Sequence, residues 1–405
     1  MFNISNRWDS RKRTLLVYRL LAVSVAVACA TPCAHAQWTV VNLHPGGVSH
    51  SYGLCVANGQ QVGESNFYAA LWTGSNASVV NLHPPSAGVG TGSTAYAVHD
   101  GRQGGYVNIG LVTPTAHASL WSGSAASWVD LHPPGATRSG IFAMHGARQG
   151  GFASGPGTSN RDHASLWSGN ALSWMDIHPA GARDSLIRAM GPGIQAGDTY
   201  FTVSAPNASL WRGTADSWVN LHPAGASRSQ ATALADGRIY GHATFAGANH
   251  AGQWTDSADS WVDFHPAGAT ASVISGAFTG IQVGSATIGG SEHACVWHNA
   301  SSSWEDLHVF LPVGTANGSH ATSAWRDLRF TYVVGYRFTS PPPRQAVMWT
   351  RCNVDLSGNG MADSPDFFAF LTAFFNDDAA ADFNYDAVVN AQDLFDFMNA
   401  FFAGC

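Results

Sequence analysis

A tryptophan at the end of a short apolar run recurs along most of this chain. It stands at Trp72, Trp121, Trp167, Trp211, Trp254, Trp297 and Trp349. Five of the seven are followed, seven residues later, by a second tryptophan, and a polar turn such as SGSAAS lies between the two. This pattern predicts a β-hairpin. Two further strand-like segments around a Gly-rich turn precede each hairpin, as in 94–110 and 231–247. Units of 40–50 residues with four short strands are typical of β-propeller blades.

The number of repeats predicts how the ring closes. The fourth strand has the form Asn/Asp, then Leu, Ile or Phe, then His, and its histidines are His44, His83, His132, His178, His222, His265 and His308. The first copy precedes the first repeated tryptophan, and the last tryptophan follows the last copy. Such an offset is expected of a ring whose N-terminal strand completes its last blade and leaves no open sheet edge. The sequence therefore predicts an all-β, seven-bladed propeller of four-stranded blades over residues 37–351.

The N-terminal segment predicts an exported protein. Residues 1–36 combine a basic stretch, an apolar run and a small-residue end, which is the pattern of a secretory signal peptide cleaved before Gln37. No other long apolar segment follows, so we expect no transmembrane segment in the mature protein and a secreted, extracellular or cell-surface location. Only 11% of residues are charged, and no basic patch suggests a nucleic-acid partner.

Residues 352–405 differ in composition from the repeats, with nine aspartates and no basic residue. Two acidic loops lie 27 residues apart, and their oxygen-bearing positions match positions 1, 3, 5, 7, 9 and 12 of a calcium loop. The predicted ligands are Asp355, Ser357, Asn359, Met361, Asp363 and Asp366 in the first loop, and Asp382, Asn384, Asp386, Val388, Asn390 and Asp393 in the second. Met361 and Val388 serve through their backbone carbonyls. Hard oxygen ligands suit Ca²⁺, so we expect one or two calcium ions.

The second calcium loop departs from the usual pattern, and a simpler explanation of the acidic tail also exists. Ala387 stands where the first loop has Gly360 at position 6, so the occupancy of the second loop stays open. The alternative is a solvated acidic tail without bound metal. Against it, an amphipathic aromatic helix is predicted after each loop, over 367–375 and 394–402. We expect the two helices to pack face to face and to bury most of their phenylalanines.

Four cysteines follow the predicted cleavage site. Cys352 and Cys405 bracket the acidic tail, and we predict that they form a disulfide, which an exported compartment permits. Cys55 and Cys295 have no obvious partner and are expected to be small buried residues.

Both parts of the chain resemble known families. The segments HASLW at 117–121 and 163–167, HAGQW at 250–254 and EHACVW at 292–297 resemble the HAF-type repeats of bacterial extracellular proteins. That resemblance implies no defined activity, and the LHP sequence after the second tryptophan departs from it. The tail resembles a type I dockerin, and more closely the dockerin-like tails ending in Gly-Cys on surface proteins of planctomycete-type bacteria. The resemblance implies an EF-hand-like calcium domain that binds a cohesin-like or cell-surface anchoring partner.

Neither the repeated histidines nor the repeated tryptophans are predicted to form a site. The fourth strand lies about three strand spacings, roughly 14 Å, outside the innermost strand. Histidines on different blades therefore point away from one another, and we interpret them as structural. A second set, His117, His163, His250 and His293, is expected to make local turn hydrogen bonds. The tryptophans are interpreted as packing between blades rather than as a sugar-stacking surface.

No catalytic residue is indicated by the sequence. Glu64, Glu292 and Glu305 are the only glutamates of the mature chain, and none has a second acid close in sequence. Residues that the fold brings together across blades stay open. The predicted function is that of an exported, non-catalytic propeller that binds a carbohydrate or protein ligand and is anchored through its tail. The alternative is a polysaccharide-active, glycoside-hydrolase-like enzyme, which needs two carboxylates about 5–9.5 Å apart in the central funnel.

Overall fold

The computed structural model describes residues 38–405 except 89, 111–112, 340–342 and 387. The predicted signal peptide lies outside these residues. In the described part of the chain, no helix has the length and apolar character needed to cross a membrane.

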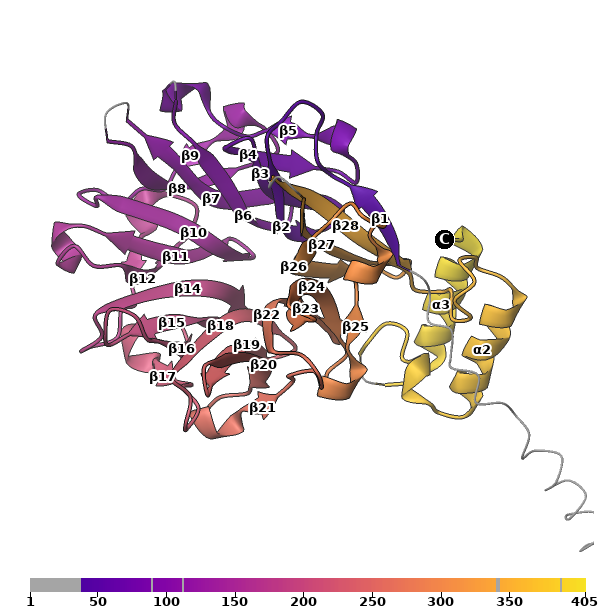
Figure 1. Cartoon of the computed structure of the whole chain (residues 1–405). Helices are drawn as coiled ribbons and strands as arrows, with labels where there is room; N and C mark the ends of the chain where they lie inside the picture. Colours follow the sequence, from indigo (N-terminus) through magenta and orange to yellow (C-terminus); the bar gives the residue numbers. More distant parts are fainter. Residues whose placement is uncertain (1–37, 89, 111–112, 340–342, 387) are drawn as a thin grey trace, which may run out of the picture.

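The described strands form seven four-stranded antiparallel sheets arranged as blades around a centre (Figure 1). Blades 1 to 3 consist of β2 (Ser51–Ala57), β3 (Gln60–Ser65), β4 (Tyr68–Trp72) and β5 (Val80–Asn81); β6 (Ser93–His99), β7 (Arg102–Ile109), β8 (Thr115–Trp121) and β9 (Val129–Asp130); and β10 (Arg138–His145), β11 (Arg148–Ser154), β12 (His163–Trp167) and β13 (Met175–Asp176). Blades 4 to 6 consist of β14 (Asp184–Gly191), β15 (Ile194–Tyr200), β16 (Pro206–Trp211) and β17 (Val219–Asn220); β18 (Arg228–Ala235), β19 (Arg238–Phe245), β20 (Ala248–Trp254) and β21 (Val262–Asp263); and β22 (Ala271–Phe278), β23 (Ile281–Ile288), β24 (Ser291–Trp297) and β25 (Glu305–Asp306).

The seventh blade joins the two ends of the repeat region. It contains β26 (Gly318–Arg326), β27 (Phe330–Phe338) and β28 (Arg344–Cys352), and its outer strand is the N-terminal β1 (Thr39–Asn42). β1 pairs antiparallel with β28, with Val40 opposite Trp349. The predicted seven blades and the predicted closure by the first strand are confirmed.

The repeated tryptophans fill the spaces between blades. All seven third-strand tryptophans are 0% exposed. Trp211, for example, belongs to a cluster that includes Leu166 and Ile177 of the preceding blade and Ile187 of its own. Because each cluster spans two blades, the hydrophobic core is a series of interfaces rather than one centre, and the predicted packing role of these tryptophans is confirmed.

Each fourth-strand histidine takes part in a hydrogen-bonded connection between blades, which we term the His–Ser latch. In one of these latches, Oγ of Ser139 accepts a hydrogen bond from the backbone N–H of Ala118 at 2.9 Å and lies 2.8 Å from Nδ1 of His132. Nε2 of His132 lies 3.0 Å from the carbonyl oxygen of Ala136. That contact requires a proton on Nε2, so in the neutral ring Nδ1 accepts the serine O–H. The seven latches are His44–Ser51, His83–Ser93, His132–Ser139, His178–Ser185, His222–Ser229, His265–Ser272 and His308–Ser319.

The structural interpretation of the latch histidines is therefore confirmed, whereas the expectation for the second histidine set was wrong. Those four do not bond to a turn; their Nδ1 atoms lie 2.7–2.9 Å from fourth-strand aspartates, and their rings stack on latch histidines at 3.8–4.3 Å. The reason is that the adjacent fourth strand places an aspartate carboxylate within hydrogen-bond distance of each of these histidines.

We expect the stability of the propeller to fall on acidification. Burial lowers the pKa of five latch histidines, namely His44, His83, His132, His178 and His308. Because the pKa is lower in the folded state, the unfolded chain binds more protons once the pH falls below about 6.5, and stability is lost in that direction. Each histidine that gains a proton on unfolding contributes up to about 1.4 kcal/mol per pH unit. Urea unfolding between about pH 8 and pH 5 measures this slope; a flat profile contradicts the prediction, and His132→Gln should reduce the slope.

The C-terminal module packs beside the last blade (Figure 1). Helix α2 (Ser364–Phe375) and helix α3 (Ala391–Ala403) face each other, and the rings of Phe370 and Phe397 stack 4.0 Å apart. Face-to-face packing of the two helices is confirmed. The expectation that they bury most of their phenylalanines was only partly correct, since two helices cover only one side of each other. Four phenylalanines remain 62–77% exposed: Phe368, Phe375, Phe395 and Phe402.

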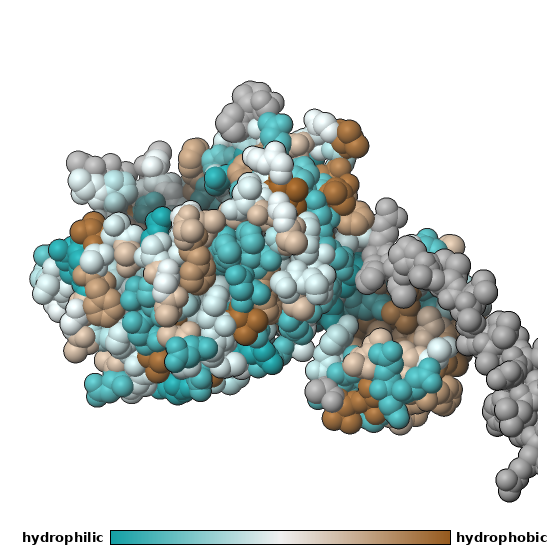
Figure 2. All heavy atoms as spheres, turned by 60° about the horizontal axis from the view of Figure 1, so that its bottom comes forward, coloured by the Kyte–Doolittle hydropathy of each residue, from teal (hydrophilic) through white to brown (hydrophobic). Residues whose placement is uncertain are grey.

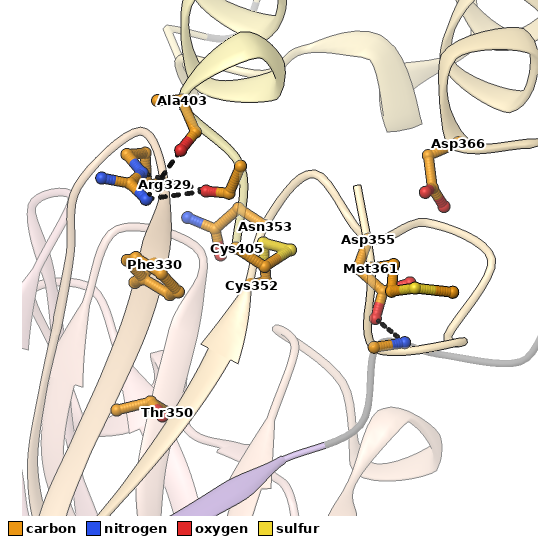
Figure 3. The surroundings of a disulfide bond; sticks show 12 residues. Arg329, Phe330, Thr350, Cys352, Asn353, Asp355, Met361, Asp366, Ala403 and Cys405 are labelled. Carbon is orange, nitrogen blue, oxygen red and sulfur yellow. Dashed lines mark hydrogen bonds between the residues drawn. A yellow bond between two sulfur atoms is a disulfide. The ribbon is translucent and has the colours of Figure 1, made fainter. Parts of the chain in front are cut away.

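The disulfide between Cys352 and Cys405 is present and ties the C-terminus to the end of β28 (Figure 3). Beside it, the guanidinium group of Arg329 donates hydrogen bonds to the carbonyl oxygens of Ala403 and Gly404. A cation at the C-terminal end of α3 complements the helix dipole. Cys295 is buried and Cys55 half-buried, and both are free thiols.

Candidate functional site

Every inner strand of the propeller carries a β-bulge at the same position. The hydrogen-bond register slips by one residue three positions after the latch serine, so one residue has no partner on the second strand. A bulge redirects the side chain of the extra residue. The seven bulge residues are Leu54, Tyr96, Phe142, Arg188, Thr232, Ser275 and Thr322.

A glycine in the second strand makes each bulge possible. A Cβ atom on Gly284 would lie 2.0 Å from the carbonyl oxygen of Val273, so only glycine allows this close approach. The same contact, at 1.8–2.0 Å, occurs at Gly63, Gly105, Gly151, Gly197, Gly241, Gly284 and Gly335.

All seven bulge residues line a central cavity of about 500 Å³. Its size is in the range of small-molecule sites. One part of the wall is aromatic: the rings of Tyr96 and Phe142 meet edge to face at 5.0 Å, and Phe142 stacks on Phe152 at 5.6 Å. Burial raises the pKa of Tyr96 well above its ordinary value, so this phenol is neutral and can act as a hydrogen-bond donor.

The adjoining part of the wall is polar. Nε of Arg188 donates to Oδ2 of the fully buried Asp198 at 2.5 Å, and Gln230 donates to the same oxygen at 3.0 Å. Arg188 remains 33% exposed where it lines the cavity. Burial and repulsion from Arg188 and Arg228 lower the pKa of His242 to about 4, so this ring is neutral near pH 7. The guanidinium group of Arg188, ion-paired with Asp198, is thus a cationic group on the cavity wall.

The carboxylate pair required by a glycoside hydrolase is not found at this wall. Among the described residues that line the cavity, none is aspartate or glutamate. Glu64 is not among the lining residues; it accepts a hydrogen bond from Thr94 at 2.8 Å and lies 3.0 Å from His50. The hydrolase alternative gains no support from this geometry.

The first predicted calcium loop is folded around its own carboxylates. Asp355, 2% exposed, accepts backbone N–H groups of Gly358, Asn359 and Gly360, and one of these bonds is drawn in Figure 3. Asp366, fully buried, accepts N–H groups of Ser357 and Asp363. Oγ of Ser357 and Oδ1 of Asp363 are buried and have no hydrogen-bond partner among the described residues. Since these oxygens stand at positions 3 and 9 of the loop, the donor set of the first loop suits a hard cation.

The second loop is more open. The buried carboxylate of Asp393 accepts N–H groups of Phe383, Asn384 and Asn390. Asp386 is exposed, its N–H donates to Asp382 and Asn384, and its carboxylate accepts the N–H of Val388. Position 6, Ala387, lies outside the described residues. In the part of the chain that the structure describes, no three His, Cys, Asp or Glu side chains converge closely enough to hold a metal.

Comparisons with known proteins identify the fold and nothing finer. No protein-family profile matches this chain, and no curated protein matches it. A structure from a study of two prolyl endopeptidases shares 11% identity at a TM-score of 0.50, over 86% of this chain and 56% of that one. A puromycin hydrolase shares 12% identity at a TM-score of 0.49, and the match covers 75% of this chain and 52% of that one. Prolyl oligopeptidase B from Galerina marginata shares 10% identity at a TM-score of 0.49, and the match covers 84% of this chain and 54% of that one. The chain thus spans about half the length of these structures, and the likeness shows the propeller fold alone.

The cavity wall was not anticipated from the sequence, although the repeats contain a usable sign of it. Each inner strand has a serine at the latch position, and the residue three positions later differs in almost every blade. In a duplicated unit, a position that varies while its neighbours stay fixed indicates a surface with its own role. The HAF-type and dockerin resemblances have no family match behind them and remain predictions.

Proposed function

We propose that this protein is an exported propeller that binds a small ligand in its central cavity and is anchored through its C-terminal module. One observation carries the binding role: seven blades share their core, latches and turns, yet present a varied set of side chains to one central cavity of about 500 Å³. A ligand site needs such asymmetry, whereas ring stability does not. Export is supported by the signal-peptide pattern and by the disulfide, which oxidising compartments favour.

A ligand screen tests the binding role. Carbohydrates on a glycan array and small anionic aromatic compounds are suitable probes, given the wall of Tyr96, Phe142 and Arg188. Phe142→Ala should weaken binding of a true ligand at least tenfold, because it removes part of the aromatic wall. Phe201→Ala, at an exposed site in the loop between β15 and β16, is the matched control. Equal affinities for both variants would place the ligand elsewhere.

For the tail, we propose a calcium-binding anchoring module, with the first loop as the better site. Asp355, Ser357, Asn359, Asp363 and Asp366 would supply side-chain oxygens and Met361 a backbone carbonyl. The buried, unpartnered oxygens of Ser357 and Asp363 support this assignment. Calcium would neutralise the cluster of carboxylates and hold the start of α2 in place.

Calcium should stabilise the full-length protein. Addition at about 100 times the dissociation constant is expected to add about 2.7 kcal/mol to the stability of the module. Asp366→Asn keeps the side-chain shape but should lose most of this gain, whereas Asp396→Asn, outside both loops, should keep it. Titration calorimetry and thermal melts with calcium or a chelator measure the effect. Melts that do not respond to calcium argue for a solvated acidic tail.

The exposed phenylalanines of the module support an anchoring partner. Phe368 and Phe395 occupy equivalent positions in α2 and α3, and so do Phe375 and Phe402; all four are exposed. Hydrophobic residues are visible on the surface of the module in Figure 2. Large apolar side chains gathered on a surface mark interaction sites. The proposed partner is a cohesin-like or other cell-surface anchoring protein.

A further inference from the structure

One histidine of the propeller lies in a setting unlike the latches. His320 in β26 has its Nε2 2.9 Å from Oγ of Ser275 in β22, and its Nδ1 2.6 Å from Oε1 of Glu292 in β24. The three residues come from blades 6 and 7 and are brought together only by the ring. We propose that Ser275, His320 and Glu292 form a nucleophile, base and orienting carboxylate for acyl transfer in the central cavity.

The protonation pattern has the direction that this chemistry needs. Burial alone would raise the pKa of Glu292, but hydrogen bonds and charge from His320, a bond from Ser285 and the charge of Arg344 lower it overall. The carboxylate is therefore ionised and can only accept, so Nδ1 of His320 carries the proton. In the neutral ring Nε2 is then the acceptor for the Ser275 hydroxyl. A base hydrogen-bonded to the nucleophile and oriented by a third group is the arrangement that activates a serine.

The hydroxyl of Ser275 also differs from the two threonine hydroxyls at bulge positions. Thr232 donates to the carbonyl oxygen of Ile274 at 2.5 Å, and Thr322 donates to that of Gly53 at 2.9 Å, so both connect neighbouring blades. Ser275 instead contacts an imidazole. It lines the cavity, whereas His320 is not among the lining residues, is 14% exposed and stacks on Tyr336 at 5.5 Å. The nucleophile thus lies between the base and the space open to a substrate.

The chemical steps balance without any further reactant than water. Oγ of Ser275 attacks the carbonyl carbon of an ester while its proton passes to Nε2 of His320. The bond to the alcohol oxygen then breaks, and Nε2 returns the proton to the leaving alcohol, which leaves an acylated Ser275. Water attacks this acyl group, gives a proton to Nε2, and releases the carboxylic acid and the free serine, to which Nε2 returns the proton. Glu292 stabilises the imidazolium ion and acts as a positioning residue.

The cavity indicates the substrate class, and this step rests on the proposed binding role. Its volume suits a small carboxylic ester. The aromatic wall of Tyr96 and Phe142 can hold an acyl or aryl group, and Arg188, two blades from Ser275, can hold a negative group on the same molecule. We therefore expect small aromatic or acyl esters, preferably anionic ones, to be the better substrates.

Covalent labelling of the full-length protein tests the inference. A fluorophosphonate probe and 4-nitrophenyl acetate should both acylate or phosphonylate one residue, located by mass spectrometry at Ser275. Ser275→Ala and His320→Gln should each lower 4-nitrophenol release at least 100-fold, on the order expected for loss of a nucleophile or base. Ser301→Ala, an exposed serine of the same blade, is the control. Thermal melts show that the variants are folded.

Two further readouts separate the possible outcomes. Glu292→Gln should lower kcat/KM and move the acidic side of the pH profile of kcat/KM to lower pH, because the imidazolium ion loses its carboxylate partner. If Glu292 had only a structural role, the substitution would leave the acidic side of this profile in place. Among the described residues, Glu292 and Tyr336 contact His320, and the guanidinium group of Arg344 lies over the ring of Tyr336. No adduct at Ser275, or equal hydrolysis by Ser275→Ala, overturns the assignment. Reversible ligand binding is measured separately on the wild-type protein and on Phe142→Ala, so a failure of the chemistry is distinguishable from a failure of the binding role.

Discussion

Trp211→Ala is expected to cost about 3–5 kcal/mol of unfolding free energy. The indole is 0% exposed and lies between blades 3 and 4 against Leu166 and Ile177. Its removal forfeits buried area and leaves a cavity that strands fixed by hydrogen bonds on both sides cannot close. Such a loss is a large part of the roughly 5–15 kcal/mol that stabilises a typical domain. Urea unfolding of the full-length protein, followed by circular dichroism, measures it.

The matched control for Trp211 is a largely exposed apolar residue of the neighbouring blade. Leu172 is 86% exposed in the turn before β13. Leu172→Ala should change stability by no more than about 0.5 kcal/mol. Trp211→Phe should fall between the two variants, because it keeps an aromatic ring but leaves part of the space empty. An unchanged midpoint for Trp211→Ala would mean that the indole does not lie between the blades.

The repeats were sufficient to predict the fold because their length and their order along the chain are those of propeller blades. Third-strand tryptophans and fourth-strand histidines recur in equal number with an offset of one, and the pairing of β1 with β28 confirms what that offset implies. The disulfide between Cys352 and Cys405 and the packing of two aromatic helices were likewise accessible, since both follow from local pattern and order along the chain.

The residues of the cavity wall could not be predicted from the sequence in the same way. A bulge is a shift in hydrogen-bond register, and no particular residue type at the bulge position predicts it. Residues as different as Tyr96, Arg188 and Ser275 occupy equivalent bulge positions in their blades. Glu292 and His320 are 28 positions apart in the chain, and the angle between two blades decides that they meet. The signs that do exist are indirect: an invariant glycine in the second strand and a variable position three residues after an invariant serine.

The second histidine set shows a different limit. The sequence places His117 and Asp130 thirteen positions apart, at the start of one strand and the end of the next. We expected His117 to make a local turn hydrogen bond, whereas antiparallel pairing sets it beside Asp130 and adds the stacked ring of His132. Register, rather than residue type, decided the outcome. Burial and the neighbouring His117 lower the pKa of His132, so this cluster contributes to the loss of stability on acidification.

Gly284→Ala should destabilise the protein by about 3 kcal/mol or more and also remove the reactivity of Ser275. A Cβ on Gly284 would lie 2.0 Å from the carbonyl oxygen of Val273 and 2.9 Å from Cα of Ile274. Both are backbone atoms of β22, which cannot rotate away as a side chain can, so the strand itself must move. The bulge that presents Ser275 to the cavity follows directly after these two residues.

A comparison with two other glycines separates the two effects of this change. Gly197→Ala meets the same contact, 2.0 Å from the carbonyl oxygen of Leu186 in blade 4, and should cost a similar free energy while fluorophosphonate labelling of Ser275 persists. Gly191→Ala meets nothing within 4 Å and should leave stability and labelling unchanged. Unfolding and labelling are measured below the melting point of the weakest variant. If Gly284→Ala keeps full labelling while it loses stability, the bulge does not position the serine, because a displaced β22 cannot hold Ser275 within hydrogen-bond distance of His320.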